Sequence, residues 1–166
     1  FERMDGYITL VHVFLLAVVM GSVMKTEKLW TYFFYTSVSV AMFVALYGLA
    51  QIGGFIDDGG QGRLNSRLGN AAYMAVYMLF HIYMVGWLAV RSKNWTFWAV
   101  SALVVAIFGY ALLLTGTRGT FLGFVGGAGV AIGYLALFGR KYPELRKYAI
   151  GGILALVILG LGFMAI

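Results

Sequence analysis

Six long apolar segments separated by short polar breaks make up most of this chain. Each is close to the roughly 20 residues that cross the hydrocarbon core of a bilayer as an α-helix. None of the segments alternates with the two-residue period of a barrel strand, so we predict helices throughout. The pattern therefore predicts an all-α fold, a polytopic transmembrane helix bundle of about six spanning helices. The segments are Tyr7–Met24, Trp30–Ala50, Ala71–Val90, Thr96–Thr115, Gly119–Phe138 and Tyr148–Ile166.

The composition agrees with this pattern and excludes an ordinary soluble domain. Hydrophobic residues make up 62% of the chain and charged residues 11%, with a mean hydropathy of +0.90. There is no Cys, which excludes disulfides and thiolate metal ligands. The chain opens at Phe1 without an initiator Met and stops at Ile166 inside an apolar run. We therefore expect residues 1–166 to form a single membrane domain that is a fragment of a longer protein.

The net charge of +6 lies in separate loops, as membrane topology predicts, and does not indicate nucleic-acid binding. Eight of the basic residues follow the first, third and fifth segments, and positive loops favour the cytoplasm. The loop at 51–70 and the turn at Arg118 are then expected on the outer face. The eight are Lys25, Lys28, Arg91, Lys93, Arg140, Lys141, Arg146 and Lys147, and the other four are Arg3, Arg63, Arg67 and Arg118.

The outward arginines are the main candidates for chemistry because the charge trend does not explain them. Arg118 lies in a short polar turn, residues 115–120, which holds it close to the membrane boundary. It can reach out to lipid headgroups or face a protein-lined anion site. Gly116 and Gly119, together with the adjacent helix start, favour an anion site. Arg63 and Arg67 are expected on the same face, and guanidinium groups bind diphosphate or carboxylate in a bidentate manner.

A stripe of polar and aromatic residues follows one face of the third segment, at Asn70, Tyr73, Tyr77, His81 and Met84. The stripe can line a groove that descends into the bilayer, or it can form a helix–helix interface. His81 has no carboxylate within a helical turn or two, which favours the interface for this residue.

Other patterns indicate structure rather than chemistry. Gly119, Gly123 and Gly127 recur every four residues, which favours close approach of a neighbouring helix. Asp57 and Asp58 are adjacent acids in a glycine-rich loop, more typical of a solvated turn than of a base or metal site. There is no phosphate-binding loop, nucleophile elbow or histidine pair at metal-binding spacing, so soluble-type hydrolase and ATPase mechanisms find no support.

Three short motifs stand out at the ends of the apolar segments. They are Glu2-Arg3-Met4-Asp5-Gly6-Tyr7, Arg63-Leu64-Asn65-Ser66-Arg67-Leu68-Gly69-Asn70-Ala71-Ala72-Tyr73 and Leu113-Leu114-Thr115-Gly116-Thr117-Arg118-Gly119. Together they resemble motifs of the O-antigen ligase and O-antigen polymerase superfamily, which are polytopic membrane glycosyltransferases of the GT-C type in the bacterial envelope. The second motif of that family usually has the pattern R-x-x-G-T-x-G-N-P, and the third is a Ser-Arg-Gly turn. Here Ser66 stands for Gly, Arg67 for Thr, Ala71 for Pro and Thr117 for Ser.

The resemblance implies a reaction without metal or cofactor. A glycan moves from a polyprenyl (undecaprenyl) diphosphate carrier to an acceptor hydroxyl at the outer, periplasmic face of the bacterial cytoplasmic membrane. The acceptor is a lipid A–core sugar, another glycan or a glycoprotein. Arg63 and Arg118 are then catalytic and hold the diphosphate, and a histidine beyond Ile166 activates the acceptor. The implied substrate-binding residues are Arg67, Asn70, Tyr73, Thr117 and Arg3.

Besides a purely structural membrane scaffold, which gives no reason for outward arginines beside glycines, three alternatives stay open at this stage. A polysaccharide polymerase or a ligase for pilin or S-layer protein has the same scaffold and differs in its acceptor. A transporter or flippase segment would carry out no covalent chemistry. Transporters more often contain inverted repeats and helices broken at mid-membrane, and neither pattern occurs in this sequence.

Overall fold

The computed structural model describes residues 2–57 and 62–138 of the chain. No strand occurs in these ranges, so the expected all-helical architecture is confirmed for them. The sixth predicted segment, Tyr148–Ile166, lies outside them. The elements are α1 (Glu2–Val23), α2 (Glu27–Ile52), the 3₁₀ helix η1 (Ser66–Leu68), α3 (Ala71–Arg91), α4 (Trp95–Leu114) and α5 (Arg118–Phe138).

Four of the described helices, α1 to α4, are long and apolar enough to cross a membrane. Three of them begin after a polar residue whose side chain accepts a hydrogen bond from a free backbone N–H group. The side chain of Thr26 accepts from Leu29 at the start of α2. Asn70 and Asn94 do the same for the N–H groups two residues ahead, at the starts of α3 and α4. These caps fix the helix boundaries in the polar breaks between the apolar runs.

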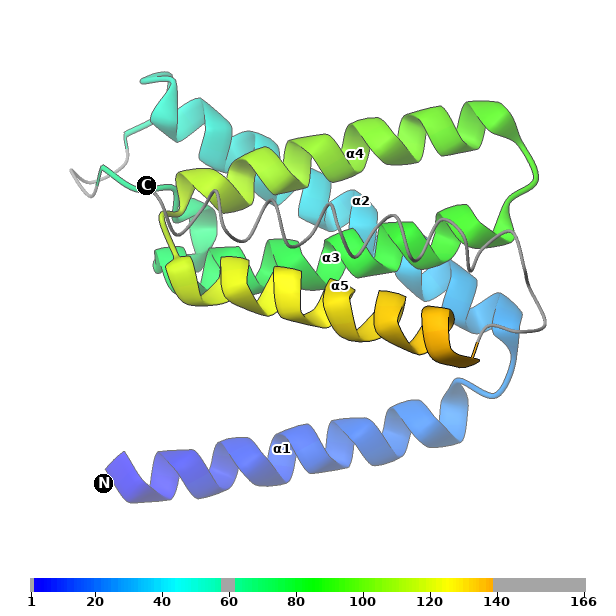
Figure 1. Cartoon of the computed structure of the whole chain (residues 1–166). Helices are drawn as coiled ribbons and strands as arrows, with labels where there is room; N and C mark the ends of the chain where they lie inside the picture. Colours follow the sequence, from blue (N-terminus) through cyan, green and yellow to red (C-terminus); the bar gives the residue numbers. More distant parts are fainter. Residues whose placement is uncertain (1, 58–61, 139–166) are drawn as a thin grey trace.

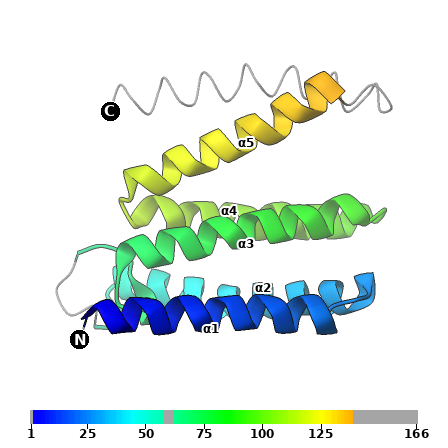
Figure 2. The same ribbon diagram turned by 90° about the horizontal axis from the view of Figure 1, so that it is seen from below.

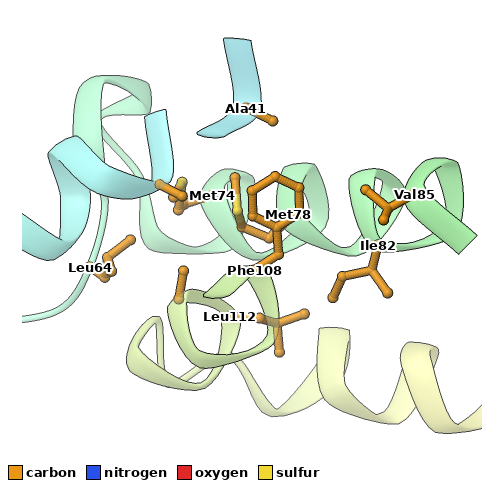
Figure 3. Close-up of a cluster of buried hydrophobic side chains, with 10 residues drawn as sticks. Ala41, Leu64, Met74, Met78, Ile82, Val85, Phe108 and Leu112 are labelled. Atoms are coloured by element: carbon orange, nitrogen blue, oxygen red, sulfur yellow. The ribbon is translucent and has the colours of Figure 1, made fainter. Parts of the chain in front are cut away.

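The helix α3 is the centre of the bundle, because it packs against α2, α4 and α5. Its buried face carries Met74, Met78, Ile82 and Val85, which meet α4 and the small residues of α2 in one cluster (Figure 3). By contrast, α1 lies apart from the other helices (Figure 1), and its described side chains are exposed or half-buried. The chain thus presents a packed group of helices with α1 beside it.

A buried polar pair joins α2 to α3. Nδ1 of His81 lies 2.7 Å from the carbonyl oxygen of Tyr77, and Nε2 lies 2.8 Å from Oγ of Ser37. Because the carbonyl can only accept, Nδ1 carries the proton and Nε2 accepts from the Ser37 hydroxyl. The interface interpretation of His81 is confirmed. Tyr73, on the same predicted stripe, is 67% exposed, so the five residues do not line one groove.

Helix α5 contacts α3 through two of the predicted small residues, and Figure 2 shows it inclined to α3 and α4. The Tyr83 hydroxyl donates to the carbonyl of Phe124 at 3.2 Å. An added Cβ would lie 2.6 Å from that hydroxyl at Gly127, and 3.9 Å from a Leu79 methyl at Gly123. The packing role is therefore confirmed for these two glycines. Within the described parts of the chain, nothing lies within 4 Å of a Cβ at Gly119, so no packing contact is seen there.

Polar contacts define the two ends of the bundle. At one end Arg91 forms a bidentate ion pair with Glu27, with N–O distances of 3.0 and 3.3 Å, and stacks over the Trp87 ring at 4.1 Å. This pair joins the end of α3 to the start of α2. At the opposite end the loop after α2 meets the turn after α4 (Figure 1). The predicted grouping by end is confirmed for the loops that the structure describes, the loop after the fifth segment lies outside the described residues, and the orientation in the membrane stays a prediction.

Candidate functional site

The loop that carries Arg63 is anchored in the helix core by its neighbours. Leu64 is fully buried, and a Cβ at Gly48 of α2 would lie 2.8 Å from its Cδ2 atom. The hydroxyl of Ser66 donates to the carbonyl of Val44 at 2.7 Å. Ser66 adopts a φ of 52°, an uncommon left-handed conformation that this bond helps to hold. The buried stretch 64–66 therefore fixes Arg63, which is itself exposed, at the end of the bundle.

The turn between α4 and α5 is also well defined. Thr115 is fully buried, and its hydroxyl donates to the Leu112 carbonyl at 2.6 Å. The same hydroxyl oxygen accepts from the backbone N–H of Thr117 at 3.3 Å. Between them Gly116 has a φ of 62°, a conformation that glycine adopts without steric cost. Thr117 and the start of α5 thus follow directly from a fixed turn.

Arg63 joins the two loops, an arrangement that we call the Arg63 clamp. Its Nε donates to the Thr115 carbonyl at 2.8 Å, and Nη2 donates to Oγ1 of Thr117 at 3.4 Å. The backbone N–H of Leu64 donates to the Leu114 carbonyl at 3.3 Å. Nε would lie 3.4 Å from a Cβ at Gly116, so the guanidinium packs directly over the turn. The structure brings Arg63 and Thr117 together, as the predicted site requires.

Arg118 is the first residue of α5 and, unlike Arg63, donates to no other residue of the described chain. Its side chain is exposed, and no hydrogen bond or ion pair joins it to another described residue. It lies at a cavity of about 260 Å³ lined by Leu112, Leu113, Gly116, Thr117, Arg118 and Phe121. The start of a long helix adds free N–H groups and the positive end of its dipole. This cavity, here called the Arg118 pocket, is suited to an anion.

An apolar groove adjoins the Arg118 pocket. It has a volume of about 230 Å³ and shares Leu112, Leu113 and Phe121 with the pocket. The rest of its lining comes from α3, α4 and α5, namely Ile82, Val105, Gly109, Phe124 and Val125. A ligand with an anionic group in the pocket can therefore place an attached apolar chain between these helices. Sequence reasoning missed the groove, because its residues have the same apolar character as those that face lipid.

The other predicted substrate-binding residues lie in different environments. Arg67 is exposed, and its guanidinium stacks over the Tyr47 ring at 4.8 Å. The side chain of Asn70 caps α3 and accepts from Ala72 at 2.8 Å. Tyr73 is exposed beyond that cap. Arg3 is in the first turn of α1, and its side chain is not among those that the structure describes. Arg67, Asn70 and Tyr73 are not among the residues that line the Arg118 pocket.

Within the described parts of the chain, no group of three or more His, Cys, Asp or Glu residues is placed to hold a metal ion. Asp58 lies outside them. The described positive groups at this end are the Arg118 side chain, the start of α5 and the Arg63 guanidinium over Gly116. No family model, no curated protein and no solved structure matches this chain. The resemblance to the O-antigen ligase superfamily accordingly stays a prediction.

Proposed function

We propose that this chain belongs to a membrane glycosyltransferase that moves a glycan from a polyprenyl diphosphate carrier to an acceptor hydroxyl. The observation that carries the proposal is the continuity of the Arg118 pocket with the apolar groove. A cation at the mouth of an apolar groove is complementary to an oxyanion attached to a long hydrocarbon chain. A polyprenyl diphosphate combines these two features.

In the proposed reaction the acceptor hydroxyl gives its proton to a general base, and its oxygen forms a bond to the anomeric carbon of the glycan. The bond from that carbon to the diphosphate oxygen breaks, and the electron pair leaves with the diphosphate. Arg118 stabilises the negative charge that develops there, because a guanidinium donates several directed hydrogen bonds to phosphate oxygens. A preorganised cation in a partly dry site is effective for this purpose, so we propose a metal-independent step.

The described histidines are not assigned as the general base. Nδ1 of His12 contacts the carbonyl of Ile8 within its own helix. His81 is buried between α2 and α3, and both of its ring nitrogens already have partners. We propose that the base comes from a part of the protein outside this chain, as the family resemblance implies.

Local backbone geometry supports the resemblance at the second motif. The family has Gly at the positions of Ser66 and Gly69, and both residues have positive φ, at 52° and 69°. Glycine adopts such angles readily. The family Asn corresponds to Asn70, which caps α3, and the family Pro corresponds to Ala71, its first residue. Proline favours the first position of a helix. The motif is therefore compatible with this loop at four positions.

The proposal extends to location and partners. We propose a multi-pass protein of the bacterial cytoplasmic membrane with about six spanning helices and with Arg63 and Arg118 at the periplasmic face. Its partners are then the lipid-linked donor, the bilayer and a glycan, lipid A–core or glycoprotein acceptor. The charge asymmetry between the loops supports this orientation.

The Arg118→Ala substitution in the full-length protein tests the proposal. We expect glycan transfer in membrane vesicles to be lost while the amount of protein in the membrane is unchanged. A matched control is Arg91→Ala, which removes an exposed arginine at the other end of the bundle. Transfer that is near normal in the Arg118 variant would refute the assignment. Movement of intact donor between leaflets without bond cleavage would favour a flippase instead.

The acceptor class is decided by what accumulates in cells that lack the protein. Unattached glycan polymer on the lipid carrier indicates a ligase. Single repeat units on the carrier indicate a polymerase on the same scaffold. If instead only a pilin or surface-layer protein loses its glycan, the acceptor is a protein.

A further inference from the structure

Arg63 and Arg118 lie next to the same turn but are not equivalent. Nε and Nη2 of Arg63 donate to the Thr115 carbonyl and to the Thr117 hydroxyl. Arg63 packs over Gly116 and is not among the residues that line the Arg118 pocket. Arg118 lines the pocket and has no partner in the described chain. The resemblance gives both arginines the same role, whereas the contacts divide them.

We propose that Arg63 is a positioning residue, which acts by holding the 115–117 turn so that Arg118 is aimed into the pocket. This inference rests on the proposed function, because it concerns the residues that would bind the diphosphate. The only described contribution of Arg63 to the pocket passes through the turn. Thr117 receives one of its bonds and directly precedes Arg118.

Arg63 can act on Arg118 through the turn because of the way α5 is attached to the other helices. Among the described helices α5 packs mainly against α3, and its side-chain bond to α3 is that of Tyr83 to Phe124, nearly two turns into the helix. The start of α5 is thus held by the packing of Thr120 and Phe121 and, at Arg118 itself, by the turn before it. Gly116 is the most permissive residue of that turn, and the clamp restricts it by bonding the residues on either side.

A double-mutant cycle on ligand binding tests this role. The full-length protein in detergent micelles is titrated with farnesyl diphosphate, a short isoprenoid diphosphate. We expect Arg63→Gln and Arg118→Gln each to weaken binding by about 10- to 100-fold, the range for loss of a charged hydrogen-bond donor. If Arg63 acts through Arg118, the double variant binds no more weakly than Arg118→Gln alone, because coupled residues are not additive.

The charge-conserving variant Arg63→Lys provides a second readout. A lysine ammonium lacks the planar fork that reaches both the carbonyl and the hydroxyl. We therefore expect Arg63→Lys to bind farnesyl diphosphate as weakly as Arg63→Gln. Restored binding would indicate that Arg63 supplies charge to the ligand directly, and would overturn the inference. If Arg63→Gln does not accumulate in the membrane, the cycle is carried out with Arg63→Lys and Arg118→Gln.

Controls separate this role from a general loss of structure. Arg91→Gln removes an arginine with two bonds to Glu27 and a stacking contact, at the opposite end of the bundle. It is expected to lower the unfolding midpoint without changing binding. Losses that multiply in the double variant would overturn the positioning role but leave the proposed function intact. Unchanged binding in Arg118→Gln would instead refute the proposed function.

Discussion

The substitution Gly127→Ala tests how α5 is held against α3. A Cβ at this position would lie 2.6 Å from the Tyr83 hydroxyl and 3.5 Å from Cζ of the same ring. Real Cβ atoms do not approach an oxygen so closely, so the tyrosine must move. Its hydroxyl then leaves the Phe124 carbonyl, to which it donates at 3.2 Å. Gly126→Ala is a matched control, because no atom of residues 2–57 or 62–138 lies within 4 Å of a Cβ at that position.

The two variants share one effect and differ in another. Replacing Gly by Ala within a helix favours folding by about 1 kcal/mol in both. Only Gly127→Ala also loses an interhelical hydrogen bond, worth about 0.6 to 1.7 kcal/mol in a membrane protein. Forcing Tyr83 off its rotamer costs about 0.5 to 1.5 kcal/mol more. We therefore expect Gly126→Ala to exceed Gly127→Ala in stability by about 1 to 3 kcal/mol.

Unfolding by sodium dodecyl sulfate in mixed micelles measures this difference in the full-length protein. Adding Tyr83→Phe to Gly127→Ala removes the obstructing oxygen and should recover most of the difference. Farnesyl diphosphate binding should weaken in Gly127→Ala but not in Gly126→Ala. The reason is that Phe124, which loses its bond from Tyr83, is part of the wall of the apolar groove. Equal stability of Gly126→Ala and Gly127→Ala would refute the contact between the helices.

Two further predictions concern the turn and the buried histidine. Gly116→Ala and Gly54→Ala both force alanine into a left-handed conformation, at φ values of 62° and 76°, at about 1 to 2 kcal/mol each. Both variants should lose stability, but only Gly116→Ala should weaken farnesyl diphosphate binding. If the two variants bind farnesyl diphosphate equally well, the role of the turn is contradicted. Ser37→Ala leaves Nε2 of His81 without its donor and should cost about 0.6 to 1.7 kcal/mol in detergent unfolding. Ser39→Ala breaks only a bond within α2, so an equal loss there would argue against the interhelical pair.

The apolar runs predicted the helices because lipid leaves a spanning chain few other ways to pair its backbone. They predicted the helix ends less well. The first segment was expected from Tyr7 and the second from Trp30, whereas α1 begins at Glu2 and α2 at Glu27. Hydropathy reports the membrane core, and helices continue through polar turns beyond it. The Thr26 cap, not hydropathy, determines where α2 begins.

The site was predictable only in part. Loop charge placed Arg63 and Arg118 at one end, and the contact of Arg63 with the turn before Arg118 agrees with this. The division of roles was not predictable, because the bond from Arg63 to Thr115 joins residues 52 positions apart. Helical periodicity placed Tyr73 and His81 on one face. It did not show that only the His81 end of that face lies beneath α2.

The two arginines also explain why an anion site is favoured over simple contact with lipid headgroups. A guanidinium at the membrane boundary needs partners for its donors, from protein, water or phosphate. Arg63 finds protein partners for two of its donors, at Nε and Nη2, so it contributes rigidity. Arg118 finds none in the described chain, yet its exposed side chain lines a cavity. Contact with bulk lipid phosphate would not require the cavity, the turn fixed by Arg63 or the adjoining groove. A lipid-linked oxyanion uses all three, because its charged group and its chain must be bound together.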